Sequence, residues 1–352
     1  MLLYIHIPFC DSKCHYCAFN SYTSLHHLQD DFVKALCCQL KHELEQIQHE
    51  NIETVFIGGG TPSCLSIIHF EQIFYILQPY LKHIKEITCE ANPNSATKSW
   101  LKGIYDLGIN RISFGVQSFN DEKLIFLNRN HTSKMATTAI QTAFDIGFQH
   151  INCDIIYDTI LDNKKLLNKD LSIINQLPID HISAYSLTIE NKTKFFNQTN
   201  VRVENIKLAH YIFDILKKYD FIQYEISNFA KNKEAYSCHN IGYWEYKQYL
   251  GCGAGAIGCI NNKRLYTHTN IATYIKNPIS YKNIETLSNN DIKIEKILLG
   301  LRSKVGINRS LLNKKELQNA IELVKLDKML LKNDRFYSTN FMLADELALH
   351  II

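Results

Sequence analysis

Six short runs of β-branched and aromatic residues recur in the first 190 residues of the chain, and segments with helical periodicity separate them. The runs span residues 2–7, 54–57, 86–90, 111–116, 151–156 and 181–187. Runs of this length and composition predict buried strands. Strands that alternate with helices predict a parallel sheet with right-handed crossovers. We therefore expect an α/β fold of the partial (β/α)6 barrel type, with a doubly wound open sheet as the alternative.

This alternation breaks beyond about residue 191, where a helix over 203–219, an aromatic stretch and a glycine-rich loop are predicted instead. The tail predicts three short helices, a strand at 335–338 and a final helix, which together favour a small winged-helix-like domain. Its basic residues are balanced by acidic ones, so a lid or docking role is favoured over DNA binding. The expected domains are a barrel at 1–190, a barrel extension at 191–290 and the C-terminal domain at 291–352.

Composition excludes several classes of protein. Hydrophobic residues make up 46% of the 352 residues and charged residues 21%, as in an ordinary packed globule. The net charge of +3 implies no strong field for nucleic acid, and no apolar run approaches the roughly 20 residues of a membrane span. The chain has 11 cysteines, an odd number, and no export signal is recognised in the sequence. Both features favour metal or redox chemistry over disulfides and predict a cytoplasmic protein.

Three of these cysteines, Cys10, Cys14 and Cys17, lie within eight residues directly after the first predicted strand. Three thiolates at this spacing can hold three corners of a 4Fe-4S cubane, which leaves the fourth iron open to a small molecule. The alternative is a structural zinc site completed by His6 or His15. Such zinc sites usually show two ligand pairs, and no second pair is nearby, so the spacing favours the cluster.

Further motifs follow the cysteines in order. They are Tyr-Ile-His-Ile-Pro-Phe-Cys at 4–10, Gly-Gly-Gly-Thr-Pro at 58–62, Glu-Ala-Asn-Pro at 90–93, Arg-Ile-Ser-Phe-Gly-Val-Gln-Ser-Phe at 111–119 and Leu-Asn-Arg at 127–129. With the three cysteines, this order resembles the radical S-adenosylmethionine (SAM) enzymes, specifically the oxygen-independent coproporphyrinogen III oxidase group. The resemblance implies a 4Fe-4S cluster on the three cysteines, SAM bound at the open iron and an electron donor for the cluster.

The resemblance also implies a set of residues that contact SAM, most of them near the carboxyl ends of the predicted strands, where a parallel barrel builds its active site. They are Tyr4, Tyr16, Gly59, Gly60, Thr61, Glu90, Gln117, Arg129 and Asp154, with Ser186 and Ile257 as weaker alignments. The two glycines are expected to let the backbone approach the ligand. One departure is Tyr-Asp-Thr-Ile at 157–160, where relatives usually carry a Gly-Leu-Pro turn.

Other departures favour the sister group of HemW heme chaperones. The oxidases carry a long N-terminal extension and a further cysteine two residues after the third ligand, whereas here the first ligand is residue 10 and the equivalent position is Phe19. The HemW group shows a His-Asn-x-x-Tyr-Trp element, which this chain carries as His239, Asn240, Tyr243 and Trp244. Imidazole can ligate heme iron, and aromatic rings can pack on the porphyrin.

The glycine-rich segment at 251–258 contains the GxGxxG pattern of dinucleotide-binding folds. That fingerprint needs a strand before it, a helix after it and an acidic residue about 20 positions on, within a βαβ unit. The surrounding sequence does not predict such a unit, so we do not expect a dinucleotide site.

Two functions follow from the resemblance. The first is a heme chaperone that binds heme and the SAM-coordinated cluster and transfers heme to hemoproteins. Such a protein could make peripheral contact with hemoproteins of the membrane. The second is a radical SAM oxidoreductase acting on a porphyrinogen. Whether the chain is an enzyme stays open between the two.

Overall fold

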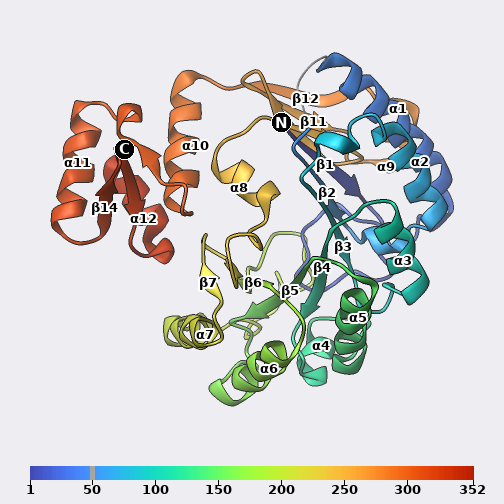
Figure 1. The fold of residues 1–352 in the computed structure, drawn as a ribbon, viewed down its shortest axis with the longest axis horizontal. Helices are drawn as coiled ribbons and strands as arrows, with labels where there is room; N and C mark the ends of the chain where they lie inside the picture. The colour runs from blue at the N-terminus through green and yellow to red at the C-terminus, as the bar shows by residue number, and fades with distance from the viewer. Residues whose placement is uncertain (48–51) are drawn as a thin grey trace.

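Six parallel strands form the centre of the larger part of the molecule. Figure 1 shows their arrangement in the computed structural model, which describes residues 1–47 and 52–352. The strands are β1 (Leu2–Ile7), β2 (Thr54–Gly59), β3 (Glu86–Ala91), β4 (Arg111–Gln117), β5 (His150–Tyr157) and β6 (His181–Ser186). Each run expected from the sequence forms one of them. They lie side by side in chain order, starting with β1 in register against β2 from Leu2↔Thr54 to Ile7↔Gly59. A doubly wound sheet reverses its strand order at a switch point, so the partial barrel is confirmed over that alternative.

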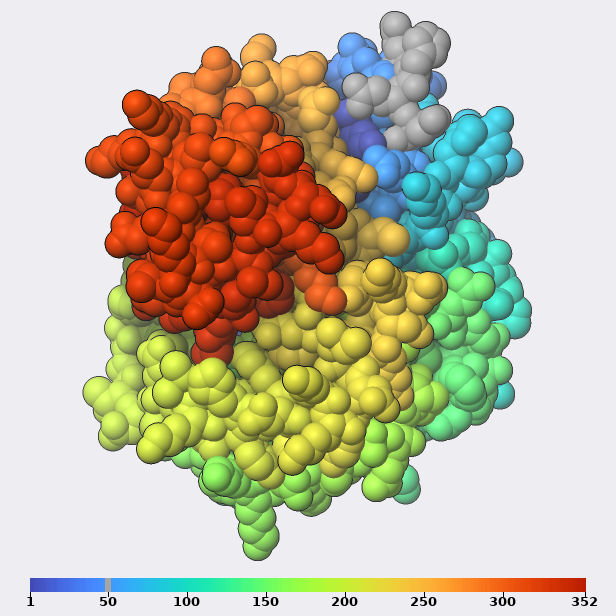
Figure 2. All heavy atoms as spheres, turned by 60° about the vertical axis from the view of Figure 1, so that its left-hand side comes forward, coloured from blue at the N-terminus to red at the C-terminus, as the bar shows by residue number. Residues whose placement is uncertain are grey.

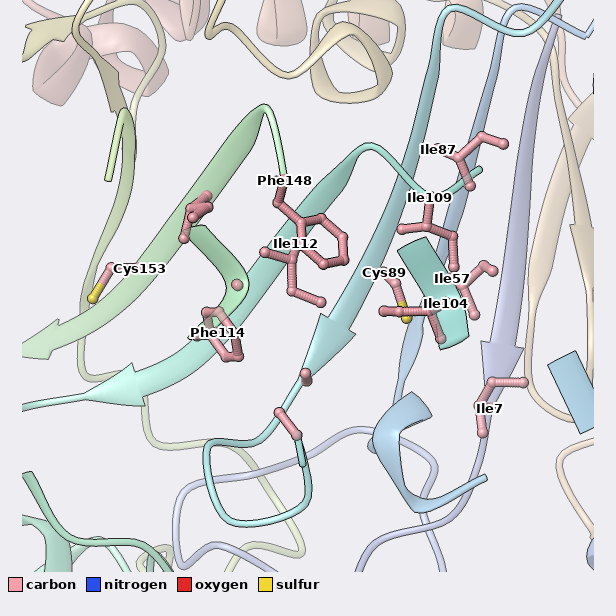
Figure 3. Close-up of a cluster of buried hydrophobic side chains, with 14 of the residues drawn as sticks. Ile7, Ile57, Ile87, Cys89, Ile104, Ile109, Ile112, Phe114, Phe148 and Cys153 are labelled. Atoms are coloured by element: carbon pink, nitrogen blue, oxygen red, sulfur yellow. The ribbon is translucent and has the colours of Figure 1, made fainter. Parts of the chain in front are cut away.

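Helices cover the outer face of this sheet. They are α1 (Gln29–Gln46), α2 (Ile67–Leu77), α3 (Lys98–Asp106), α4 (Asp121–Phe126), α5 (Ser133–Ile146), α6 (Lys164–Gln176) and α7 (Ile206–Lys218). Short 3₁₀ turns lie at His26–Leu28, Pro62–Cys64 and Leu81–His83. Every second residue of a strand points to the helices, and these residues form the core that Figure 3 shows, with Ile7, Ile57, Cys89, Phe114 and Cys153 on adjacent strands.

The opposite face of the same strands is polar. Alternation places Tyr4 and His6 on β1, Glu90 on β3 and Asp154 on β5 on the side away from the helices. Burying such side chains is costly unless they are hydrogen-bonded or meet a ligand. The polar inner face therefore marks where the functional site lies.

Later segments extend the sheet at both edges. Strands β8 (Asn228–Ala230) and β7 (Ile222–Gln223) follow β6, while β9 (Tyr249–Cys252) pairs parallel to β1 and leads to β10 (Ile257–Ile260), β11 (Lys263–Thr267) and β12 (Tyr281–Thr286). Helices α8 (Cys238–Trp244) and α9 (Ile271–Lys276) belong to the same region. The glycine-rich segment is thus a turn between β9 and β10, and a strand follows it instead of the helix that a dinucleotide site needs.

The C-terminal end forms a smaller unit with its own buried cluster, from Ile297 to Ile351. It comprises α10 (Asn289–Leu301), β13 (Ile307–Asn308), α11 (Lys314–Lys325), β14 (Met329–Lys332), β15 (Arg335–Ser338) and α12 (Ala344–Ile351), with 3₁₀ turns at Arg309–Leu311 and Phe341–Leu343. The three strands form one antiparallel sheet in the order β13-β15-β14. Helices with a small sheet fit the expected winged-helix-like unit, and Figure 2 shows the unit (red) packed against the yellow and orange segments. The expected domain boundaries at 190 and 290 stay predictions.

None of the helices in the described part of the chain combines the length and the apolar character that crossing a membrane requires.

Candidate active site and large aromatic cavity

The three cysteines lie on a loop that leaves the carboxyl end of β1 and returns to it. The loop is closed where the backbone N–H of Cys10 donates to the carbonyl of Tyr22 (3.0 Å) and that of Tyr22 donates to the carbonyl of Pro8 (2.8 Å). All three cysteines line one cavity of about 390 Å³, which we call the cysteine cavity. The sequence spacing therefore does bring the three thiols to one site.

Two of the thiols already accept hydrogen bonds. Thr61 Oγ1 donates to Cys10 Sγ at 3.3 Å, and an Arg129 guanidinium nitrogen donates to Cys14 Sγ at 3.1 Å. Donors aimed at sulfur stabilise a thiolate, the form that binds metal. Burial, with a smaller effect of the neighbouring cysteines, raises the pKa values of Cys10 and Cys17, so their thiolate form needs such donors or a bound metal.

The Leu-Asn-Arg motif at 127–129 holds the cysteine loop along its length. The carbonyl of Leu127 accepts from the backbone N–H of His15 (3.2 Å), Asn128 Nδ2 donates to the carbonyl of Lys13 (2.9 Å), and Arg129 reaches Cys14. Sequence reasoning expected only Arg129 here, as a contact of SAM. The role of Asn128 was missed, although the motif itself had been noticed.

Among residues 1–47 and 52–352, no three His, Cys, Asp or Glu side chains converge closely enough to hold a single metal ion. The zinc alternative needs such convergence. His6 is also engaged at both ring nitrogens, with Tyr4 Oη at 2.9 Å and the carbonyl of Asn20 at 2.8 Å. A cubane does not need the thiolates to meet at one point, because each binds a different iron. The donor set therefore fits a cluster better than zinc.

Most of the residues implied to contact SAM line the cysteine cavity. They are Tyr16, Gly59, Gly60, Thr61, Glu90, Gln117, Arg129, Asp154 and Ser186. Tyr4 and Ile257 line a different and larger cavity instead. Asn92 was not expected, yet it lines the cysteine cavity and links two of the expected residues: its Nδ2 donates to Thr61 Oγ1 (3.1 Å) and its Oδ1 accepts from Arg129 (2.5 Å).

Two partly buried carboxyl groups face the cysteine cavity. Burial, with the nearby Asp154, raises the pKa of Glu90 to about 8, and its Oε2 accepts from the backbone N–H of Gly59 at 3.1 Å. Burial raises the pKa of Asp154 to about 6. A ligand with positive charge would favour the ionised forms of both groups, which suits the sulfonium and amino groups of SAM.

The shift at Glu90 gives a testable pH dependence. Because its folded pKa lies above the ordinary value of 4.5, Glu90 favours the fold below about pH 4.5, and this contribution is lost as pH rises toward 8. We expect the melting temperature of ligand-free Glu90→Gln, measured calorimetrically, to fall less than that of the wild type between pH 5 and pH 8. Each unit of pKa shift corresponds to about 1.4 kcal/mol, so the difference is measurable.

The control is Glu204→Gln, at an exposed carboxylate. If the melting temperatures of wild type and Glu90→Gln change in parallel across this pH range, the raised pKa of Glu90 is contradicted.

A buried hydrogen-bond chain connects Asp154 to the start of α8. The backbone N–H of Ser237 donates to Tyr224 Oη (3.2 Å), which pairs with His181 Nε2 (2.7 Å). His181 Nδ1 pairs with Asn152 Oδ1 (2.6 Å), and Asn152 Nδ2 donates to Asp154 Oδ1 (2.7 Å). Burial holds the pKa of His181 well below its usual value, so its neutral ring donates through Nδ1 and accepts through Nε2.

The packing of the protein itself also requires the glycines of the 58–62 motif, whose expected approach to a ligand stays a prediction. A Cβ on Gly60 would lie 2.7 Å from the carbonyl oxygen of Phe9 and 2.8 Å from that of Ile7, and a Cβ on Gly59, whose φ is +111°, would lie 2.4 Å from His6 Nδ1. The space is thus filled by β1 itself. These glycines allow β2 to pack against the backbone that carries Cys10.

The departure at 157–160 preserves a strained turn. Asp158 has φ of +66°, a conformation that favours glycine but that Asp tolerates. Its carboxylate accepts from Ser186 Oγ at 2.6 Å and from the backbone N–H of Asn205 at 3.3 Å. Ser186, one of the expected SAM contacts, is therefore held by Asp158 at the edge of the cysteine cavity.

His239 lies at the opposite end of the strands from the cysteines. Its Nδ1 pairs with Thr54 Oγ1 (2.8 Å) at the start of β2, a strand roughly 16 Å long that ends beside Cys10. Glu86 fixes the start of α8 by accepting from the backbone N–H groups of Cys238 and His239, both at 3.0 Å. A buried ion pair with Arg111 (2.9 Å) holds Glu86 in turn.

The His239 side chain is only 1% exposed, and its Nε2 is buried without a hydrogen-bond partner. Burial lowers its pKa to about 3, so the ring is neutral at physiological pH. When Nδ1–H donates to Thr54, Nε2 keeps a free lone pair. The ring centroids of Phe56 and Tyr243 lie 5.2 and 4.8 Å from that of His239.

His239, Asn240 and Tyr243 line the larger cavity, of about 1010 Å³, which we call the aromatic cavity. Its aromatic lining comprises Tyr4, Phe19, Phe56, Tyr243, Tyr246 and Tyr249. Trp244, the last residue of the expected heme element, is not among the described residues that line it. Ala18 and Phe19 border both cavities, so the tail of the cysteine loop lies between them.

Comparison with known proteins agrees with this geometry. The sequence model of the Radical SAM superfamily matches residues 4–163. The heme chaperone HemW of Bacillus subtilis is 32% identical over 320 residues, covering 87% of this chain and 84% of that protein. HemW of Lactococcus lactis is 33% identical over 315 residues, covering 86% and 82%.

Among solved structures, coproporphyrinogen III oxidase (HemN) of Escherichia coli, described as a radical SAM enzyme, superposes with a TM-score of 0.84. The superposition covers 99% of this chain and 89% of that one at 18% identity. The structural match shows a shared fold. The match to the Radical SAM superfamily implies a SAM-coordinated 4Fe-4S cluster, and the cysteine loop fits such a cluster. The sequence identities to the two HemW proteins show that the chain belongs to the HemW family of radical SAM proteins.

Proposed function

We propose that this chain is a heme chaperone: it binds heme in the aromatic cavity, carries a SAM-coordinated 4Fe-4S cluster in the cysteine cavity, and transfers heme to hemoprotein acceptors. The observation that carries the proposal is the neutral, unpartnered Nε2 of His239 beside a large aromatic cavity. Relatives that are named heme chaperones support it.

The aromatic cavity has the chemistry that heme needs. Its volume of about 1010 Å³ lies at the upper end for ligand pockets, which suits a ligand as large as heme. Aromatic rings pack on a flat apolar macrocycle, and neutral imidazole is a common axial ligand of heme iron. Because Nε2 is buried near the rings of Phe56 and Tyr243, ligation requires these rings to move apart.

In the cysteine cavity, Cys10, Cys14 and Cys17 would hold the cluster, and Thr61 and Arg129 would hydrogen-bond two of the thiolates. Glu90 and Asp154 would balance the positive charge of SAM. The cluster held there would supply one-electron reduction chemistry to the bound SAM. The protein's part is to hold the thiolates, to position the charges and to keep the site partly closed to water.

The second candidate is a radical SAM oxidoreductase that acts on a porphyrinogen. The observation that favours it is the cavity in which the expected SAM contacts lie together with the cysteines. Against it stands Phe19, which is 67% exposed where the oxidases are expected to carry a further cysteine.

The deciding experiment combines two assays on anaerobically reconstituted protein. Heme titration followed at the Soret band should saturate at one heme per chain, and coproporphyrinogen III with SAM and a reductant should give no protoporphyrinogen. Turnover of coproporphyrinogen without saturable heme binding would reverse the assignment.

A further inference from the structure

Helix α10 of the C-terminal unit has two faces with different partners. Ile297, Gly300 and Leu301 are buried, and Ile297 and Leu301 belong to the unit's own core. A second face of α10, whose residues recur at three- and four-residue spacing, lines the aromatic cavity. It comprises Ile292, Glu295, Lys296 and Leu299, with Leu298 beside them and Arg302 directly after the helix. The C-terminal unit therefore forms one wall of the cavity, opposite the aromatic side chains of the barrel.

Basic residues outnumber acidic ones among the side chains that line the aromatic cavity. Four basic residues line it, Lys247, Arg264, Lys296 and Arg302, against one acidic residue, Glu295, among the described lining residues. A basic residue that lacks an acidic partner at the wall of such a cavity would suit a flat ligand that carries carboxylates at one edge.

Three of the four basic residues already have acidic partners. Lys247 pairs with Glu53 at 2.9 Å, Arg302 pairs with Asp345 at 2.7 Å, and Arg264 pairs with Glu285 and Glu295. Lys296 differs, because no carboxylate in the described part of the chain lies within ion-pair distance of it. Its Nζ lies 5.3 Å from the ring centroid of Tyr246, another residue of the cavity wall.

We propose that α10 forms the second wall of the heme site and that Lys296 pairs with a heme propionate. This inference rests on the proposed function. In this arrangement the barrel side supplies His239 and the aromatic wall. The C-terminal unit supplies an apolar surface through Ile292 and Leu299, and its Lys296 contacts a carboxylate at the ring edge. Heme thus bridges the two units of the chain.

The test compares hemin with hemin dimethyl ester, which keeps the ring and the iron but lacks the carboxylates. Soret titrations are done on wild type, Lys296→Ala, Lys296→Glu and the control Lys314→Ala, an exposed lysine of α11 away from the cavity. We expect hemin affinity to fall roughly tenfold in Lys296→Ala, as for loss of a charge-assisted pair, and further in Lys296→Glu. The ester should bind wild type and Lys296→Ala equally.

Each of the other outcomes refutes either the propionate pair or heme binding as a whole. Equal hemin affinity in wild type and Lys296→Ala, or an equal loss for hemin and ester, refutes the propionate pair while heme binding by the wild type stands. A wild type that binds no heme refutes the proposed function and this inference together. Thermal melts of the ligand-free variants show whether a loss of affinity reflects unfolding.

Discussion

Replacing Cys14 with alanine is expected to remove most of the iron and sulfide from anaerobically reconstituted protein. In the proposed cluster each cysteine would be the only protein ligand of one iron, so a cluster held by two thiolates should be lost during purification. The fold should persist, because Arg129 loses Cys14 Sγ but keeps Asn92 Oδ1 and the carbonyl of Gly115, both at 2.5 Å. Iron and sulfide analysis, with absorbance near 400 nm, measures the loss.

The matched control is Cys38→Ala, because Cys38 is exposed on α1 and its removal touches neither cavity. Cys64 is less suitable, since its Sγ lies 3.4 Å from Asp11 on the cysteine loop, and Cys252 is fully buried in the core. Full iron and sulfide content in Cys14→Ala would refute the cluster ligands. Zinc in place of iron in protein purified from cells would favour the zinc alternative.

The parallel strands could be predicted because their sequence signal is local. Each of the six runs is apolar enough to be read as buried, and their alternation with helices sets the fold. Strand β12 gave no such signal, because five of its six residues are exposed and it lacks a buried face. Strand β13 is only two residues long, too short for periodicity to appear.

The candidate site also has a part that the sequence predicts and a part that only the structure shows. The cysteine spacing and the ordered motifs predicted the residues of the cysteine cavity, because most of them lie near strand ends and parallel strand ends meet at one edge. The partnership of Asn92 with Arg129 depends on tertiary packing, as does the wall formed by α10. Neither has a local pattern in the sequence. The sequence motif identified Gly59 and Gly60 as site residues, but only the structure shows that the chain of β1 and the residues after it fills the space beside them.

Replacing His239 with alanine is expected to remove or strongly shift the Soret band of the heme-loaded protein while the iron-sulfur absorbance persists. The variant loses the imidazole that would ligate heme iron, and β2 separates this residue from the cysteine loop. Because burial lowers the pKa of His239 to about 3, protons should not compete with iron at this ring between pH 6 and pH 8. Heme affinity should therefore fall at least tenfold across this whole pH range.

The controls follow from which sulfur atoms border the aromatic cavity. Cys238 and Cys252, the thiols nearest to His239 and to the glycine-rich turn in the sequence, are not among its described lining residues, whereas Cys259 is. Cys259→Ala is thus the variant that tests a rival thiolate ligand, and it should keep the heme spectrum of the wild type. If Cys259→Ala loses the band and His239→Ala keeps it, the axial ligand is the thiolate on β10, and the buried imidazole serves only to join α8 to the start of β2.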